Sequence, residues 1–101
     1  MIVAFSLSPM SSDPSGSVTE AVAAAVRVVR ASGLPHETTS MFTNIEGEWD
    51  EVMAVVKRAV DAVSAASPRV GLVLKADIRP GYDGQFTAKV ERIEEALRDG
   101  Q

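Results

Sequence analysis

A polar strand end that runs directly into an acidic helix start lies near the middle of this 101-residue sequence. From Thr43 to Glu46, polar residues surround Ile45, which is the alternation expected of a strand with one buried face. Gly47 then tolerates a sharp change of backbone direction. Three acidic residues follow it within four positions, where they oppose the positive end of a helix dipole. Because hydrogen-bonding side chains meet a helix start here, we expect a small-ligand site at this junction.

The sequence contains few of the groups that catalytic and metal sites need. It has one histidine, His36, which we expect on a surface strand, and no cysteine. A Ser-His-Asp group, a multi-histidine metal site and thiolate chemistry are therefore not expected. Small domains that hydrolyse acyl phosphates need an arginine in a phosphate-binding loop, but the loop at residues 10–16 contains Asp13 and no arginine. We expect no enzyme activity, no catalytic residue, no metal and no cofactor.

The charge and hydropathy of the chain indicate its class of partner. Its formal net charge of −4 is repelled by a phosphate backbone and its basic residues are scattered, so we expect no nucleic-acid binding. No apolar run approaches the roughly 20 residues of a membrane span. The first residues have the pattern of a strand and not of a signal peptide. We therefore expect one cytoplasmic domain over residues 1–101, with no membrane partner. An acidic protein also suits a cationic ligand.

Hydrophobic periodicity predicts four strands and three helices. The predicted strands cover residues 2–9, 34–40, 41–46 and 69–79, and the predicted helices cover residues 17–32, 48–66 and 87–98. Their order is βαββαβ with a C-terminal helix, which predicts an α+β, ferredoxin-like sandwich with an antiparallel sheet in the order 4-1-3-2. The hairpin between the second and third strands should turn near Ser40, although no glycine or asparagine stands there.

Particular residues are expected to begin or bury these helices. Ser17 and Glu20 have the spacing of a capping box, and Thr87 is expected to cap the last helix. Trp49 begins the apolar stripe of the middle helix, so we expect it in the core rather than as a stacking platform. Tyr82 lies in a loop with proline and glycine, where it either acts as a lid or is simply exposed.

The alternation along the strands leaves one sheet face without a helix. The residues of this open face are neither fully polar nor fully apolar: Ala4, Ser6, Ser8, Phe42, Asn44, Glu46, Val73, Lys75 and Asp77. A mixed face of this kind either stays half-solvated or contacts another surface. We expect it to meet a second copy in a symmetric homo-oligomer. RNA-binding sheets carry several aromatic rings on this face, whereas only Phe42 lies here.

Three segments of the sequence resemble the thiamine-binding protein family. They are SLSP at residues 6–9, TNIEGEWDEVM at residues 43–53 and LKADIR at residues 74–79. The resemblance extends from Ile2 to about Leu97 and is most specific at the junction of strand, Glu-Gly, acidic turn and helix. It implies a small ferredoxin-like domain that binds thiamine or its hydroxymethylpyrimidine part, for carriage, salvage or sensing, and that forms dimers or tetramers. A structural or regulatory homo-oligomer without a ligand is the alternative.

The resemblance also implies which residues hold the ligand. Thiamine presents an aminopyrimidine that needs hydrogen bonds and two rings that need an apolar or aromatic wall. The implied ligand-binding residues are Ser6, Ser8, Phe42, Thr43, Asn44 and Glu46. Alternation places Thr43 on the core side with Ile45, so either a bulge turns it, or the site lies on the helix side, or Thr43 is structural. Glu46 either binds the ligand or is an acidic residue at the start of the helix with no ligand role.

Overall fold

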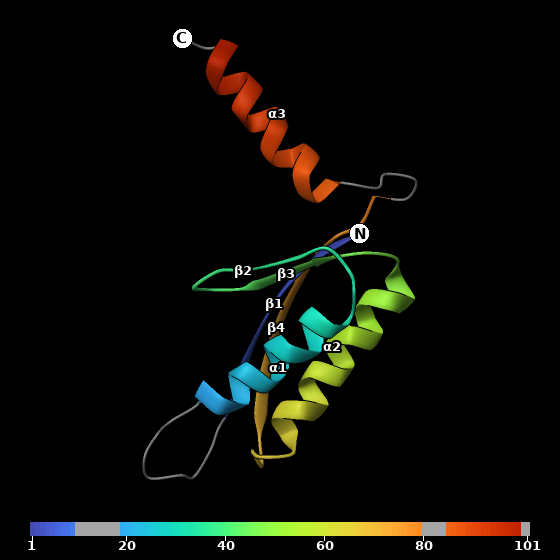
Figure 1. Ribbon diagram of the computed structural model, residues 1–101, viewed down its shortest axis with the longest axis vertical. Helices are drawn as coiled ribbons and strands as arrows, with labels where there is room; N and C mark the ends of the chain where they lie inside the picture. The colour runs from blue at the N-terminus through green and yellow to red at the C-terminus, as the bar shows by residue number, and fades with distance from the viewer. Residues whose placement is uncertain (10–18, 80–84, 100–101) are drawn as a thin grey trace.

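The structure is a computed structural model that describes residues 1–9, 19–79 and 85–99 (Figure 1). Its elements follow the chain as β1 (Ile2–Pro9), α1 (Thr19–Ala31), β2 (His36–Thr38), β3 (Thr43–Glu46), α2 (Trp49–Ser64), β4 (Val70–Asp77) and α3 (Gln85–Asp99). This is the predicted βαββαβ order with a C-terminal helix. Within the described ranges, no helix is both long enough and apolar enough to cross a membrane.

The four strands form one antiparallel sheet in the order β2-β3-β1-β4. This is the predicted order counted from the opposite edge, so the α+β, ferredoxin-like class is confirmed. Phe5 in β1 lies opposite Thr43 in β3 and Leu74 in β4. Side chains directly opposite one another project from the same face of a sheet. Phe5, Thr43 and Leu74 therefore share the face that carries the core.

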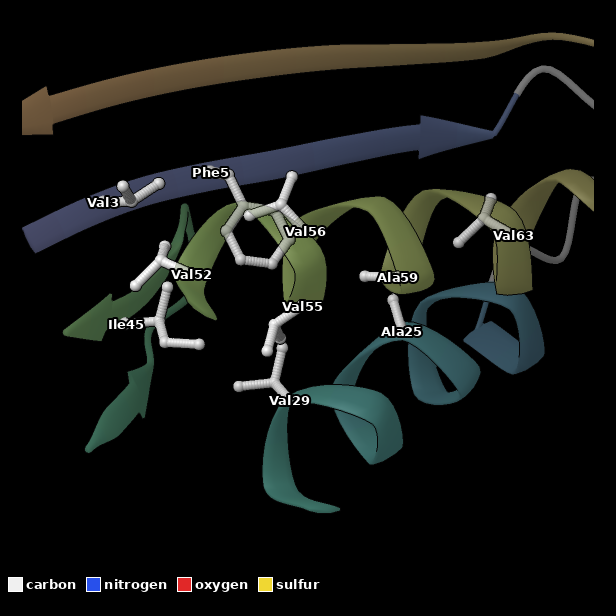
Figure 2. Packing of buried hydrophobic residues seen from close by; sticks show 10 residues of the cluster. All are labelled: Val3, Phe5, Ala25, Val29, Ile45, Val52, Val55, Val56, Ala59 and Val63. Carbon is white, nitrogen blue, oxygen red and sulfur yellow. The ribbon is translucent and has the colours of Figure 1, made fainter. Parts of the chain in front are cut away.

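Helices α1 and α2 cover this face, and both leave the other face of the sheet open (Figure 1). Helix α2 packs against β1 and β4, and α1 packs against β1 and β2. The buried apolar residues are mostly small (Figure 2): Val3, Phe5, Ala25, Val29, Ile45, Val52, Val55, Val56, Ala59 and Val63. Valine and alanine let the helices approach the sheet closely, and each fully buried valine stabilises the fold by about 1.5–3 kcal/mol.

Local hydrogen bonds and one glycine explain where α1 ends and α2 begins. Gly33 follows α1 with a φ of 77°, the left-handed conformation that glycine adopts without strain. The Ser32 hydroxyl donates to the Val29 carbonyl and so satisfies one acceptor of the last turn. Glu48 is the N-cap of α2, and its amide donates to Oε1 of Glu51 at 3.3 Å, as in a capping box.

Two predictions about helix starts are wrong. Trp49 is not in the core, because 54% of its surface is exposed at the first position of α2. Helical spacing predicts the side of the helix on which Trp49 lies, but not how far the sheet extends beneath the first turn. Thr87 does not cap α3, since this helix already begins at Gln85. Ser17 and Tyr82 lie outside the described residues.

Helix α3 extends away from the two-layer sandwich (Figure 1). Its predicted apolar side is present but solvent-exposed, at 56%, 60% and 61% for Val90, Ile93 and Leu97. On the open face of the sheet, Val73 is 59% exposed. The chain therefore presents apolar side chains on two surfaces that α1 and α2 do not cover.

Candidate functional site

A cavity of about 220 Å³ lies on the helix-covered side of the sheet, between α1, β1 and the β2–β3 hairpin. We refer to it as the hairpin cavity. Its apolar wall consists of Phe5, Leu7, Val22, Ala25, Val26, Val29, Met41 and Phe42. Its hydroxyl-bearing residues are Ser6, Thr38, Thr39, Ser40 and Thr43. The combination of an apolar wall with a few hydrogen-bonding groups is typical of small-molecule sites.

The register of the sheet explains how Thr43 reaches this cavity. Thr43 lies opposite Phe5 in β1 and opposite Thr38 in β2. Pairing continues without interruption from Thr43 to Glu46, so no bulge turns the Thr43 side chain. Because Phe5 is a core residue, its cross-strand neighbour Thr43 also faces the helices. The bulge is therefore excluded, and a site on the helix side or a structural role stay open for Thr43.

The tip of the hairpin is held by the side chain of Thr39. Its hydroxyl donates to the Phe42 carbonyl at 3.0 Å and accepts from the amides of Met41 and Phe42 at 3.3 and 3.1 Å. The Thr39 amide also donates to the Phe42 carbonyl at 2.8 Å. These bonds close a two-residue turn, and Gly33 is the only described residue of the chain with a positive φ. The expected turn near Ser40 therefore forms without glycine, because a threonine hydroxyl takes the place of backbone partners.

Strand β1 presents a backbone edge to the same cavity. Its pairing with β3 ends at Phe5, whereas its pairing with β4 continues to Pro9. Among the described strands, the edge of β1 that faces the hairpin therefore has no partner after Phe5. Such an edge exposes backbone N–H and C=O groups, and both Ser6 and Leu7 line the cavity. Together with the hydroxyls, this edge can satisfy both donors and acceptors of a flat heterocycle.

The predicted ligand-binding residues separate into two groups. Ser6, Phe42 and Thr43 line the hairpin cavity. The other three do not line it: Ser8, Asn44 and Glu46. The register places Asn44 opposite Ala4 and Glu46 opposite Ile2, which puts both on the face away from the helices.

Glu46 and Gly47 lie instead in a tightly packed corner of the fold. The Met1 ammonium donates to the Gly47 carbonyl and the Gly47 amide donates to the Met1 carbonyl, each at 3.1 Å. A Cβ on Gly47 would lie 3.1 Å from Cγ2 of Val52 and 3.3 Å from Cδ1 of Leu34. Only glycine fits such a space without movement of its neighbours. Gly47 therefore has a packing role in this corner, and Glu46 beside it is buried, with 7% of its surface exposed.

Sequence reasoning missed the cavity residues of α1 and most of those at the hairpin tip. Val22, Val26 and Val29 follow one another at helical spacing, which predicts a core stripe. The structure shows that this stripe lines the cavity and that Val22 is 39% exposed at its rim. An apolar helical stripe has the same sequence pattern whether it packs closely in a core or lines a cavity. For the hairpin tip, the adjacent Thr39 and Ser40 were a usable turn signal.

The chain is similar to known proteins over nearly its whole length. A family model described as thiamine-binding protein matches residues 3–94. UPF0045 proteins from Mycobacterium bovis and Mycobacterium tuberculosis are each 52% identical over 98 residues, covering 96% of this chain and 94% of the relative.

Solved structures show the same fold. A hypothetical protein of Methanocaldococcus jannascii superimposes with a TM-score of 0.82 at 30% identity and covers 93% of this chain and 95% of its own. A Bacillus cereus domain of unknown function, DUF77, has a TM-score of 0.73 at 34% identity. The match covers 79% of this chain and 76% of that domain's chain. A Thermotoga maritima protein provisionally assigned to thiamine biosynthesis or salvage has a TM-score of 0.73 at 24% identity. The match covers 88% of this chain and 96% of that protein's chain, and at this identity it shows the fold alone. From the extent of the family match, this chain belongs to the thiamine-binding protein family.

Proposed function

We propose that this protein binds thiamine, or its hydroxymethylpyrimidine part, in the hairpin cavity and does not transform it. Family membership supplies the ligand class. The observation that carries the proposal is the hairpin cavity itself, which combines an apolar wall with hydroxyl groups and a strand edge. Its role would be carriage, salvage or sensing of the vitamin in the cytoplasm.

The lining of the cavity suits a flat pyrimidine ring. The half-buried Phe42 and the valines of α1 both line the cavity, so the ring can contact an aromatic and an aliphatic surface. Thr38 and Thr43 share the helix-facing side of the hairpin, so their hydroxyls can serve the amino group and ring nitrogens. The proposed ligand set therefore narrows to Phe42, Thr43 and the backbone of Ser6, with Thr38 added.

The same lining supports binding rather than catalysis. Among the described residues, no histidine, carboxylate, lysine or thiol lines the cavity. General acid–base catalysis needs such groups within hydrogen-bond reach of the ligand, and a serine or threonine nucleophile needs one of them beside it as a base. Thiamine is accordingly proposed as a ligand and not as a catalytic cofactor.

We further propose that the protein forms a homo-oligomer, a dimer or a tetramer, through the surfaces that α1 and α2 leave uncovered. Val73 on the open sheet face and the Val90, Ile93 and Leu97 stripe of α3 are more than half exposed. Apolar stripes of this kind mark interaction surfaces, and a second copy offers the same surfaces in return. Light scattering should give a mass above that of one 10.7 kDa chain, and Ile93→Glu should lower it. A wild-type mass of one chain would contradict this assembly.

Calorimetric titration tests the proposed ligand. Thiamine and hydroxymethylpyrimidine should each bind with one site per chain. Both should also raise the melting temperature, since a ligand that binds only the native state stabilises it. Absence of heat and of any thermal shift with both molecules at millimolar concentration would contradict the proposal and favour an oligomeric module without a ligand.

A further inference from the structure

The hairpin cavity has no ionisable side chain among its described lining residues. Its polar lining residues all carry hydroxyls: Ser6, Thr38, Thr39, Ser40 and Thr43. Ser6 lies opposite Val73 of the open face, so it contributes its backbone rather than its hydroxyl. Hydroxyls and a strand edge hydrogen-bond well to a neutral heterocycle. They do not neutralise a full charge, whose burial without a partner is far more costly than that of a neutral polar group.

The described residues that line this cavity include no cation. None of the ten lysines and arginines is among the lining residues. The segments outside the structural description, residues 10–18, 80–84 and 100–101, contain neither lysine nor arginine. The first turn of α1, whose dipole end is positive, carries the acidic Glu20. A phosphate inside the cavity would therefore meet no cation among the described lining residues, in a protein of net charge −4.

The size of the cavity also limits what it can enclose. Drug-sized ligand sites usually have roughly 300–1,000 Å³, whereas this cavity has about 220 Å³. One ring fits within such a volume better than two linked rings. The rim, where Val22 and Met41 are 39% and 73% exposed, leaves the rest of a longer ligand in solvent.

We propose that the hairpin cavity recognises the uncharged aminopyrimidine alone and discriminates against a phosphate on its methylene carbon. This inference rests on the proposed function and names the form of ligand that the site takes. The methylene carbon carries a hydroxyl in hydroxymethylpyrimidine, a phosphate in the phosphate ester of that alcohol, and the cationic thiazolium in thiamine. The rim of an acidic protein accepts the neutral hydroxyl and the cationic thiazolium. It repels the phosphate, which carries a charge of about −1.5 to −2 at neutral pH.

Calorimetry with these three molecules and with the isolated thiazole alcohol tests the inference. Hydroxymethylpyrimidine and thiamine should bind within about fivefold of each other, the phosphate ester should bind at least fivefold more weakly, and the thiazole should not bind. Equal or tighter binding of the phosphate ester would overturn this inference and leave the proposed function intact. Binding of none of the pyrimidines would overturn the proposed function and the inference with it.

A pair of variants at the rim tests whether charge is the cause. Met41 is largely exposed, so Met41→Lys adds a cation there without disturbing the core, and Met41→Gln is the uncharged control. Compared with Met41→Gln, Met41→Lys should improve the affinity for the phosphate ester, relative to the free alcohol, by about three- to fivefold. The gain should shrink at high salt, because a surface charge pair is screened. An unchanged ratio in the two variants would show that charge does not determine the selectivity.

Discussion

The two ends of β3 differ in how the chain uses them. At the junction end, where β3 meets α2, Ile45 and Val52 are completely buried, and a Cβ on Gly47 would lie only 3.1 Å from Val52. At the hairpin end, where β3 meets β2, the same layer of the fold contains the hairpin cavity. The junction is the most distinctive part of the sequence, yet it is the packed end. The difference teaches that a distinctive motif can be used for close packing while a cavity forms one strand length away.

The largest expected effect comes from opening the junction end. Ile45→Ala should lower the free energy of unfolding by about 2–5 kcal/mol, because Ile45 is fully buried and its neighbours cannot collapse completely into the space. Its matched variant at the hairpin end, Met41→Ala, should change stability by less than about 0.5 kcal/mol, since Met41 is 73% exposed. Urea denaturation measures both. Similar losses at the two sites would abolish the distinction between the ends.

Adding atoms to the junction end should be the next most damaging change. Gly47→Ala should destabilise the protein by about 1–3 kcal/mol through overpacking, since its Cβ would meet Val52 at 3.1 Å. In a Val52→Ala background the same substitution should cost less, because the nearest obstructing atom has been removed. A double-mutant cycle in thermal unfolding measures this coupling. Strict additivity would show that Val52 does not limit the space at Gly47.

A smaller effect is expected from loosening the hairpin end. Thr39→Val removes the hydroxyl that holds Met41 and Phe42, and should cost about 1 kcal/mol of stability. It should also weaken thiamine binding by about three- to tenfold, because the tip forms one wall of the cavity. Thr39→Ser keeps the hydroxyl and should retain wild-type affinity. A Thr39→Val protein that binds as well as Thr39→Ser would show that the turn bonds do not position the site.

The smallest effect is expected from the polar residue of β3 that faces away from the cavity. Asn44→Ala should change thiamine affinity by less than about twofold, since Asn44 lies on the other face of the sheet. Thr43→Val, one position earlier, should weaken binding by about three- to tenfold through loss of a hydroxyl. Calorimetry on the two variants compares the faces directly. If Asn44→Ala weakened binding more than Thr43→Val, the ligand would lie on the open face instead.

The sequence was sufficient for the fold because each element has a clear period. Alternation in residues 2–9 and 69–79 and the helical stripes between them predicted the elements, and the connections restrict the sheet order. Trp49 was misplaced because periodicity gives the side of a helix but not the extent of the layer it faces. The start of α3 was misplaced because Thr87 is only one of several possible caps, and propensity alone does not choose among them.

The candidate site was less predictable for a related reason. Whether Thr43 or Asn44 faces the helices follows from alternation, but which face contains a cavity depends on how far α1 stands from the hairpin. The valines of α1 have the same spacing in either case. The turn at Thr39 depends on one side chain bonding to three backbone groups, which is visible only when the backbone is in place.

The most direct test of the central claim is a titration of ¹⁵N-labelled protein with hydroxymethylpyrimidine, followed by backbone amide chemical shifts. If the ligand occupies the hairpin cavity, the largest shifts should fall in residues 38–43, at Ser6 and Leu7, and along the cavity side of α1. The amides of Asn44, Glu46 and Gly47 should move much less. If the largest chemical-shift changes fell at the junction end or in β4, with residues 38–43 unchanged, the account would be contradicted.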